Sequence, residues 1–376
     1  MRRNVFIKAL VLGAIGCAFT ITGMAADVQN GHGQGQADST TEVNEAKHEA
    51  VNTNWLDRTD ITVGAQSKVG AQVSIETLQP LTHYDENSKS VLFVQGGIGK
   101  GGQEDKASYF SGGNGGFWYP YNPITKKGEQ RYRPEEHHDT KSLGTVANVG
   151  VGYRVLSKHE HAYVGVNTFY DHSFSKKYNR ISGGLEYVSS LNEVRANIYK
   201  GLNSTKSERY NVPLYEGYFE FLLDGGTAGY TVYKSQKALS GYDVSYARTF
   251  KNARWARAYV GAYHWNGLGV KTHGEGPALS LNVGKSHGWQ AGTTLQLTPH
   301  VSLDVGYTSD NNHSSGAYGF VKYTLGTSKF AWYGGKHSDD TITNARARML
   351  DKVDRSPMRV GNTYEEFWMV VPYDHL

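Results

Sequence analysis

A strict two-residue alternation between Leu143 and Tyr187 constrains the fold of this chain more than any other feature. In three consecutive runs, apolar residues such as Val149, Val164 and Leu185 occupy one set of alternate positions, while small, polar or charged residues occupy the other. Successive side chains of a strand point to opposite faces, so the pattern predicts three strands with one apolar and one polar face each. Strands of about ten residues, apolar outside and polar inside, are typical of outer-membrane β-barrels.

The composition is compatible with a membrane barrel. The 376 residues include 26 Tyr and 45 Gly but 9 Pro, and aromatic residues make up 12% of the chain, as expected for girdles at two membrane interfaces. The mean hydropathy of −0.54 resembles that of a soluble protein, but only half of each barrel strand has to face lipid. Past the N-terminus, no apolar run approaches the roughly 18 residues that a spanning helix needs.

Two N-terminal segments precede the predicted barrel. Residues 1–26 have a basic start, an apolar core and a small-x-small cleavage site at Gly23-Met24-Ala25, which predicts a secretory signal peptide. The only cysteine, Cys17, lies inside that core, and lipidation there is the weaker alternative because the apolar run continues past it. Residues 27–53 are polar and aperiodic, so we expect a disordered periplasmic linker. Removing the signal-peptide cations lowers the 39 basic residues to 36 against 35 acidic ones, which does not suggest nucleic-acid binding.

Alternating runs continue on both sides of the central region and give about fourteen predicted strands by Leu325. The weakest of them is Ala278–Val283, and Leu214–Lys234 resembles an extra hairpin. Since bacterial barrels of a single chain have an even number of strands, a last strand near Arg359 would make one of the others wrong. We therefore predict an all-β fold, with an antiparallel transmembrane barrel at residues 54–328.

The pattern changes after Gly326. Asp339-Asp340 is a candidate N-cap, and apolar residues between Ile342 and Val353 recur at three- and four-residue spacing until Pro357. This spacing predicts a short helix after the barrel, within a C-terminal helix and linker segment at 329–376.

The stretch Gly101–Lys141 is long and rich in glycine and aromatic residues, and its second part, from Lys126 to His138, is charged. In a barrel it belongs with the long extracellular loops. Its aromatic cluster is the candidate surface-binding site of this chain, and covering the barrel mouth is an equally weighted alternative. The cluster consists of Phe117, Trp118, Tyr119 and Tyr121.

Charged residues recur at the positions that the alternation turns toward the lumen. They either form an ion pathway or pair across the lumen, and mixed signs at low dielectric favour pairing. The predicted inward charges are Glu76, Arg154, Asp171, Glu186, Glu193, Arg195, Glu220, Asp243, Asp304 and Lys322.

Other tempting motifs have ordinary explanations. The glycine-rich runs 96–102 and 112–116 do not precede a helix in a βαβ unit, so turn flexibility is favoured over phosphate binding. His137-His138 and His159-x-His161 lack partners at metal-ligand spacing. No nucleophile elbow or other catalytic spacing is present. We therefore predict no catalytic, cofactor or metal site, and no enzyme.

Several local motifs, in order along the chain, resemble those of the intimin/invasin inverse autotransporters. They are Trp55-Leu56, Leu78-Gln79-Pro80-Leu81, Leu92-Phe93-Val94-Gln95-Gly96-Gly97, Gly150-Val151-Gly152-Tyr153-Arg154, Gly165-Val166-Asn167-Thr168-Phe169-Tyr170-Asp171, Arg180 to Glu186-Tyr187, Gly241-Tyr242-Asp243, Leu297-Thr298-Pro299 and Val353-Asp354-Arg355. The resemblance implies a twelve-stranded barrel that exports a C-terminal passenger through its own lumen and anchors it outside as an adhesin.

This chain departs from the family pattern in four ways. No peptidoglycan-binding module is expected before the barrel, Gly101–Lys141 is unusually long, and the extra hairpin would allow fourteen strands. About fifty residues follow Leu325, too few for an immunoglobulin-like or lectin-like domain.

The first hypothesis is therefore an outer-membrane barrel that anchors and exports a short C-terminal segment, with the helix around Ile342–Val353 in or near the lumen. The alternatives are a stand-alone porin-like barrel, a surface-binding barrel that uses the 101–141 loop, and a truncated adhesin. The partners to be expected are outer-membrane lipid, the barrel-assembly machinery, periplasmic chaperones and a host or matrix receptor, with no nucleic acid and no cofactor.

Overall fold

The computed structural model describes residues 55–85, 87–111, 135–213, 229–271, 280–283, 285–311, 315–326, 331–335, 345–356 and 359–370. The segments predicted at 1–26 and 27–53 lie outside these residues. So do residues 214–228 of the predicted extra hairpin, which include Glu220, and the aromatic cluster Phe117, Trp118, Tyr119 and Tyr121.

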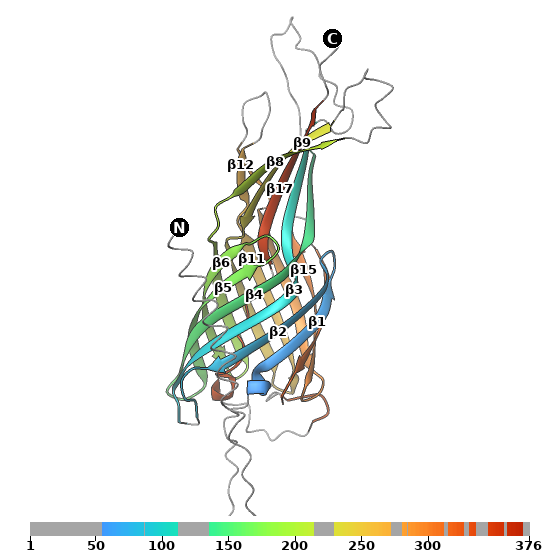
Figure 1. Ribbon diagram of the computed structural model, residues 1–376. Coiled ribbons are helices and arrows are strands. Elements are labelled where there is room, and N and C mark those ends of the chain that lie inside the picture. The colour runs from blue at the N-terminus through green and yellow to red at the C-terminus, as the bar shows by residue number, and fades with distance from the viewer. Residues whose placement is uncertain are drawn as a thin grey trace, which may run out of the picture.

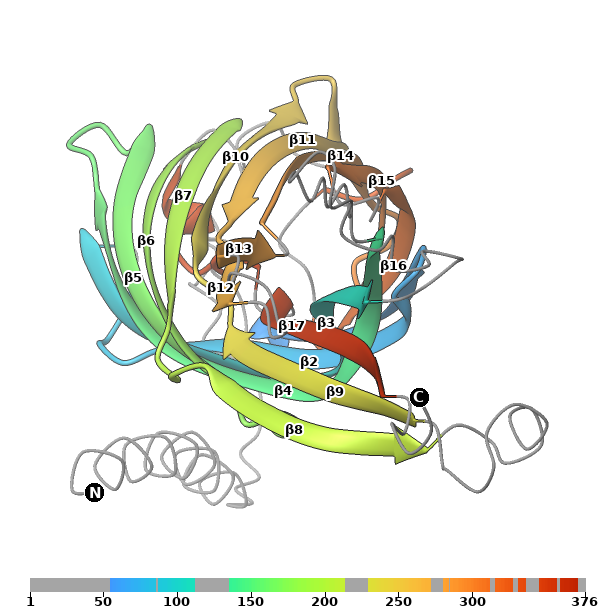
Figure 2. The ribbon, with the colours of Figure 1, turned by 90° about the horizontal axis from the view of Figure 1, so that it is seen from above.

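Twelve antiparallel strands close into a barrel (Figure 1, Figure 2). Each strand pairs with the next, and β1 closes the ring on β16 from Asp60↔Thr324 to Gln66↔Tyr318, so the wall has no open edge. The ring is formed by β1 (Thr59–Gln66), β2 (Gly70–Pro80), β3 (Ser90–Ser111), β4 (Glu135–Leu156), β5 (Ala162–Ser173), β6 (Asn179–Ser189), β7 (Asn192–Gly201), β10 (Gly241–Phe250), β11 (Ala253–Trp265), β14 (Ser286–Gln296), β15 (Val301–Asp310) and β16 (Gly316–Thr324).

The sequence left twelve or fourteen strands open, and the described ring has twelve because the surplus strands lie outside the wall. The hairpin predicted at Leu214–Lys234 is described only from Gly229 onward, as part of β9 (Gly229–Ala238), and β9 pairs with the earlier strand β8 (Lys206–Pro213). The weak strand near Ala278 is β13 (Ser280–Val283), which pairs with β12 (Leu268–Lys271) in a separate two-stranded sheet.

The prediction of one long loop over Gly101–Lys141 is wrong for its described parts. Residues 101–111 continue β3 and residues 135–141 continue β4, and the two strands stay paired as far as Phe110↔Glu135. Figure 1 shows this hairpin rising well above the barrel wall. The ladder hydrogen bonds satisfy backbone groups that a loop would have to leave to water.

The two ends of the barrel differ in the length of their connections. At the lower end in Figure 1, near the 3-10 turn η1 (Trp55–Arg58), the connections are as short as residues 190–191 and 251–252. The upper end carries the extended β3–β4 hairpin, the β8–β9 hairpin and the β12–β13 hairpin. Bacterial barrels have short periplasmic turns and longer extracellular loops, so the lower end is the periplasmic one.

The two faces of the wall follow the alternation of the sequence. On β5, Val164 and Val166 are 58% and 51% exposed, while Asn167 and Phe169 on the other face are buried. Val151 and Val305 are likewise exposed, as expected for side chains that face lipid.

The chain returns to the barrel after β16. A 3-10 turn, η3 (Ala345–Arg348), is followed by Met349–Ser356 without regular secondary structure, and then by β17 (Arg359–Val370). Figure 2 shows β17 inside the outline of the ring, beside β3. The helix predicted over Ile342–Val353 is therefore reduced, in the described residues, to one turn.

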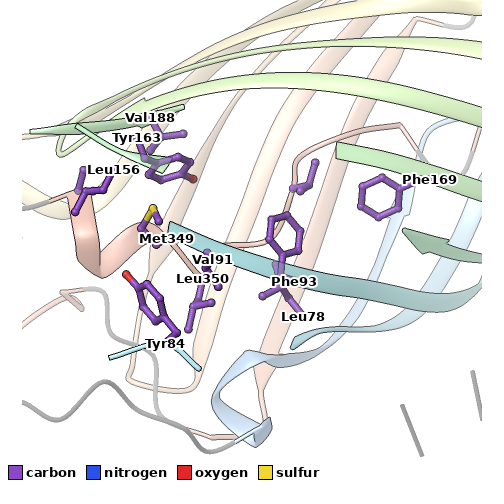
Figure 3. Packing of buried hydrophobic residues seen from close by; sticks show 12 residues of the cluster. Leu78, Tyr84, Val91, Phe93, Leu156, Tyr163, Phe169, Val188, Met349 and Leu350 are labelled. Carbon is purple, nitrogen blue, oxygen red and sulfur yellow. The ribbon is translucent and has the colours of Figure 1, made fainter. Parts of the chain in front are cut away.

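The periplasmic end of the lumen holds the main hydrophobic cluster of the protein (Figure 3). Ala345, Met349, Leu350 and Val353 pack there against apolar side chains of the wall and its turns. The wall side contributes Leu78, Tyr84, Val91, Phe93, Leu156, Tyr163, Phe169 and Val188. The apolar spacing that suggested a helix thus marks the residues that a barrel core buries.

Candidate functional site: the barrel lumen

The inner faces of β4 to β7 carry ion pairs between neighbouring strands. Arg154 on β4 donates from Nε and Nη2 to Glu186 on β6, at 2.5 and 3.1 Å, and both side chains are fully buried. Gly165 on the intervening β5 makes room for this pair, because a Cβ there would lie 2.5 Å from Glu186 Oε1. The predicted inward charges Arg154 and Glu186 are therefore partners, and pairing offsets the cost of burying them.

A second centre forms around Glu193 on β7. Its carboxylate accepts from Arg195 Nη1 at 2.8 Å, and from Arg257 Nε and Nη2 at 2.9 Å each. It also accepts from Arg348 Nη2 of the C-terminal segment at 2.5 Å. Glu193 is 2% exposed. Through these bonds its carboxylate joins the wall strands β7 and β11 to the segment in the lumen.

Asp171 on β5 forms the third centre. It pairs with Arg180 of β6 at 2.8 Å and with Arg355 of the C-terminal segment. Arg180 also lies over the Tyr199 ring at 4.4 Å, and Arg355 over the Phe169 ring at 4.3 Å. Aromatic faces thus support the two cations beside the carboxylate.

The other predicted inward residues have polar partners as well. Glu76 accepts from Gln95 Nε2 at 2.9 Å, and Asp243 accepts from Asn197 and from Tyr199, both at 2.7 Å. Asp304 accepts from the Tyr259 hydroxyl at 2.7 Å, and Lys322 lies 3.7 Å from Asp60. These last two line an open part of the lumen.

Four cations of the segment 345–356 pair with carboxylates of the barrel, and in the opposite sense Asp354 of the segment lies 3.5 Å from Arg195 and 3.6 Å from Arg257 of the wall. In chain order the four pairs of segment cations are Arg346–Glu160 at 2.5 Å, Arg348–Glu193 at 2.5 Å, Lys352–Asp60 at 2.5 Å and Arg355–Asp171. The four acids come from β1, β5, β7 and the β4–β5 turn. Three strands and one turn of the wall therefore hold the segment.

The wall also binds the backbone of the segment. Gln95 on β3 accepts from Val353 N at 2.8 Å and donates to Val353 O at 3.4 Å, as a neighbouring strand would. Arg154 Nη1 donates to Met349 O at 2.8 Å and to Asp351 O at 2.6 Å. Backbone groups that a helix would use internally are thus bound by wall side chains, which explains why the helix stops after η3.

Further along, the polar side chains of β7 bind the end of the segment. Tyr199 Oη accepts from Ser356 N at 2.9 Å, and Asn197 Nδ2 donates to Asp354 O at 3.2 Å. Ser356 Oγ donates to Asp243 at 3.0 Å. Contacts with the wall therefore continue over the whole length of the described segment.

The segment does not fill the lumen. A cavity of about 620 Å³ remains beside it, lined among others by Asp60, Tyr259, Gln290, Asp304 and Tyr318. The lumen thus has a packed side, formed by β3 to β7 with the segment, and an open side, formed by β1, β11 and β14 to β16.

Sequence reasoning missed residues on both sides of these contacts. On the wall they are Asp60, Gln95, Arg180, Asn197 and Tyr199, and in the segment they are Arg348, Lys352, Arg355 and Ser356. The alternation could have predicted that the strand residues among them face the lumen. Arg180 shares a face with Glu186, and Asn197 and Tyr199 share a face with Arg195. The residues after Leu325 had no such signal in their own pattern. The family resemblance led us to expect the segment around Ile342–Val353 in or near the lumen, but it did not indicate which side chains bind there.

In the described part of the chain, no group of three or more His, Cys, Asp or Glu residues is placed to hold a metal ion. None of its helices is long and apolar enough to cross a membrane.

The sequence match to a known family agrees with this geometry. Residues 135–357, more than half of the chain, match the family described as inverse autotransporter, beta-domain. The chain belongs to this family. The matched stretch runs from β4 to the end of the lumenal segment, so in this inverse autotransporter barrel the segment is part of the family's domain. The barrel accordingly lies in the bacterial outer membrane.

Three solved structures with some likeness to this inverse autotransporter barrel share little sequence with it. A chain solved in work described as "Unveiling the Mechanism Behind the in-meso Crystallization of Membrane Proteins" is 14% identical, with 81% of this chain and 99% of that chain covered and a TM-score of 0.49. The outer membrane protein Omp33 of Acinetobacter baumannii is 9% identical, with coverages of 71% and 97% and a TM-score of 0.29. The beta domain of the Bordetella autotransporter BrkA is 8% identical, with the same coverages and a TM-score of 0.26. All three TM-scores are below 0.5, and no curated protein matches the chain.

Proposed function

We propose that this barrel anchors and exports the polypeptide that follows β16, holding it in the lumen on its way to the cell surface. The observation that carries the proposal is the binding of residues 345–356 inside the barrel. Four ion pairs and a series of side-chain bonds to the backbone fix this segment between the periplasmic end and the emerging β17.

The contacts are of a kind that suits an anchor. Burying charges is costly unless both partners are present, so the wall carboxylates and the segment cations depend on each other. Asp171 and Glu193 each pair with a wall arginine and with an arginine of the segment. This pairing of wall carboxylates with segment arginines is expected of a lumen that holds one particular polypeptide, and solute passage does not require it.

The direction of the chain also supports export. The segment begins next to the periplasmic turns, where Tyr84 Oη donates to Arg346 O at 2.9 Å and Arg346 binds Glu160. It ends at Ser356, and β17 then runs beside the upper part of β3 (Figure 1). Such a path supports the proposal that the residues after Ser356 reach the extracellular side.

The test is the position of an epitope tag placed after Leu376. On intact cells we expect externally added protease to remove this tag. The same tag inserted within residues 27–53, the predicted periplasmic linker, is the control and should survive until the outer membrane is permeabilised. A C-terminal tag that stays protected together with the control would reject export and favour a plain barrel.

A porin-like barrel is the second candidate, and the cavity of about 620 Å³ beside the segment is the observation in its favour. Planar-bilayer recordings on the full chain separate the two. Export with a held segment predicts low, rarely fluctuating conductance, whereas a porin predicts stable open channels together with a protected C-terminal tag.

A surface-binding role for the 101–141 region remains part of the proposal, with a host or matrix receptor as partner. Replacing residues 112–134 by a short turn should leave β3 and β4 paired, since loop length changes closure entropy by only about 0.6 kcal/mol per doubling. Loss of binding to cells or matrix, with normal barrel assembly, would support this role. Unchanged binding would exclude it.

A further inference from the structure

The edge of β3 changes its partner where the strand leaves the wall. Below this point β3 pairs with β2, and the pairing ends at Val73↔Lys100. Above it β3 pairs in parallel with β17, from Arg359↔Gln103 to Trp368↔Ser111. Gly101, with φ of +99°, marks the change, and a Cβ there would lie 2.7 Å from Gln72 and 2.8 Å from Ala71 O. Above Lys100, this edge of β3 therefore has no partner among the strands of the wall and is paired with β17 instead.

A second edge faces this one. β9 pairs with β17 in antiparallel fashion from Gly361↔Ala238 to Val370↔Gly229, and its other side is covered by β8. Figure 1 and Figure 2 show β17 between β3 and β9. The β3–β4 and β8–β9 hairpins therefore form a slot, defined by residues 101–111 of β3 and by β9. Without β17, both walls of the slot would expose unpaired backbone groups.

Side chains in the slot recognise one register of β17. Thr363 Oγ1 is bonded to Glu104, which also accepts from Tyr178 Oη at 2.9 Å, and Gln236 Nε2 donates to Thr363 Oγ1 at 3.3 Å. Gly361 lies against the ring of Tyr178, where a Cβ would come within 2.1 Å of Cε2.

Two residues further along, charge adds to this recognition. Glu365 lies between a cation from each wall of the slot, with Lys106 Nζ at 2.7 Å and Lys234 Nζ at 3.6 Å. Burial alone would raise the pKa of Glu365, but the hydrogen bond and charge of Lys106, with Lys234, lower it below its ordinary value. A shift of the strand by two residues would move Glu365 away from both lysines.

We infer that this slot is a strand-binding site for the emerging polypeptide, which takes an extended Gly-x-Thr-x-Glu segment and holds it outside as a latch. Addition of a strand to free sheet edges is a general way of binding extended peptides. Residues 361–368 are bonded on both sides, so moving the chain back into the lumen would break two ladders at once. The inference rests on the proposed export function, because the slot lies above the upper, extracellular end of the barrel and the chain has to pass through the lumen to reach it.

The first test detects the register by cross-linking. Cys17 is the only cysteine of the sequence and lies in the predicted signal peptide, so introduced pairs have no competitor. Asn362→Cys with Lys237→Cys joins residues that face each other directly, and we expect most of the protein on oxidised cells to carry this disulfide. Asn362→Cys with Ser235→Cys, displaced by two residues along β9, is the matched control and should link at least about tenfold less. Equal linking of both pairs, or linking of neither, would overturn the inference.

The second test uses backbone hydrogen exchange in the purified full chain. Amides of residues 361–368 should exchange slowly, and Gly361→Val should speed their exchange by at least about tenfold through its clash with Tyr178. Gly269→Val on β12 is the control, because a Cβ there meets no atom within 4 Å. Slow exchange that persists in Gly361→Val would show that the slot does not recognise this strand.

The two proposals fail in different ways. One outcome is that protease removes the C-terminal tag while the 362–237 disulfide does not form and the amides of residues 361–368 exchange fast. In that case export stands and the latch is wrong. If the tag is protected inside the cell, export is wrong and the latch falls with it.

Discussion

The two sides of the lumen are built from the same kind of strand, yet they hold their polar groups differently. On the packed side, Arg154, Asp171 and Glu186 are at most 3% exposed and are paired with charges or with the backbone of the segment. On the open side, Asp304 and Lys322 are partly exposed toward the cavity and have one polar partner each at the distances given above. Position in the sequence pattern does not separate these groups, but the presence of the segment does.

The difference teaches that a barrel lumen is stabilised by what occupies it. Charges on the packed side are costly to separate because water cannot replace their partners, whereas those on the open side can be rehydrated in the cavity. Substitutions of the same kind on the two sides should therefore have unequal effects.

The largest effect is expected for removing one negative charge on each side. Glu193→Gln leaves Arg195, Arg257 and Arg348 without their shared carboxylate, and we expect a loss of about 3–5 kcal/mol in the free energy of unfolding. Asp304→Asn keeps an oxygen that accepts from Tyr259, and should cost less than about 1 kcal/mol. Denaturant titration of the protein in detergent, followed by tryptophan fluorescence, measures both. Equal losses would remove the distinction between the two sides.

The outer face provides the next test, because there the two sides should not differ. Val151→Arg on β4 and Val305→Arg on β15 each place a cation in lipid near the middle of a strand, at an expected cost of about 2–4 kcal/mol. The same unfolding titration applies, with Val305→Leu as an apolar control. Arginine at Gly150, the lumen-facing neighbour of Val151, cannot serve as a control, because even a Cβ there would lie 2.3 Å from the Phe169 ring. A clear difference between the two arginine variants would mean that the lipid-facing register is wrong on one side.

A smaller effect is expected for the amide that binds the segment. Gln95→Leu removes both bonds to Val353 and leaves buried backbone groups unpaired, which should cost about 2–3 kcal/mol. Hydrogen exchange at the Val353 amide should then accelerate. The matched variant on the open side is Gln290→Leu, which lines the cavity and should leave that amide unchanged. Unchanged exchange in Gln95→Leu would show that Gln95 does not hold the segment.

The smallest effects are expected for two hydroxyl deletions. Tyr199→Phe removes the acceptor of Ser356 N, while Asp243 keeps its bonds from Asn197 and Ser356, so about 1–2 kcal/mol should be lost. Tyr318→Phe, on the open side, removes the hydroxyl contact with Tyr259 at 2.5 Å and should cost below about 1 kcal/mol. Thermal unfolding of the two variants under identical conditions ranks them, and the reverse order would contradict the comparison.

Much of the wall could be predicted from the sequence. The alternation of Val164 and Val166 with Asn167 and Asp171 fixes which face meets lipid, because the strand period is two and a slip of one residue inverts every side chain. The same reasoning assigned Arg154 and Glu186 to one lumen, although it could not say that they are partners. Their pairing passes over β5, and only the sheet order brings β4 and β6 that close.

The region after Leu325 and the upper hairpins show where sequence reasoning stops. The apolar spacing from Ala345 to Val353 is real, but a local pattern cannot tell a helix from a segment buried by a surrounding wall. What decides is the set of partners that Gln95 and Arg154 offer to its backbone.

The sequence by itself thus determined the fold class and the two faces of the wall, because these depend on periodicity and hydrophobicity along the chain. The tertiary structure decided that twelve strands close the ring, that residues 345–356 occupy the lumen and that β17 joins β3 to β9. These features depend on hydrogen bonds and ion pairs between residues up to about 260 positions apart, such as Gln95 with Val353, and no local pattern records which distant partner a free edge or a buried charge will find.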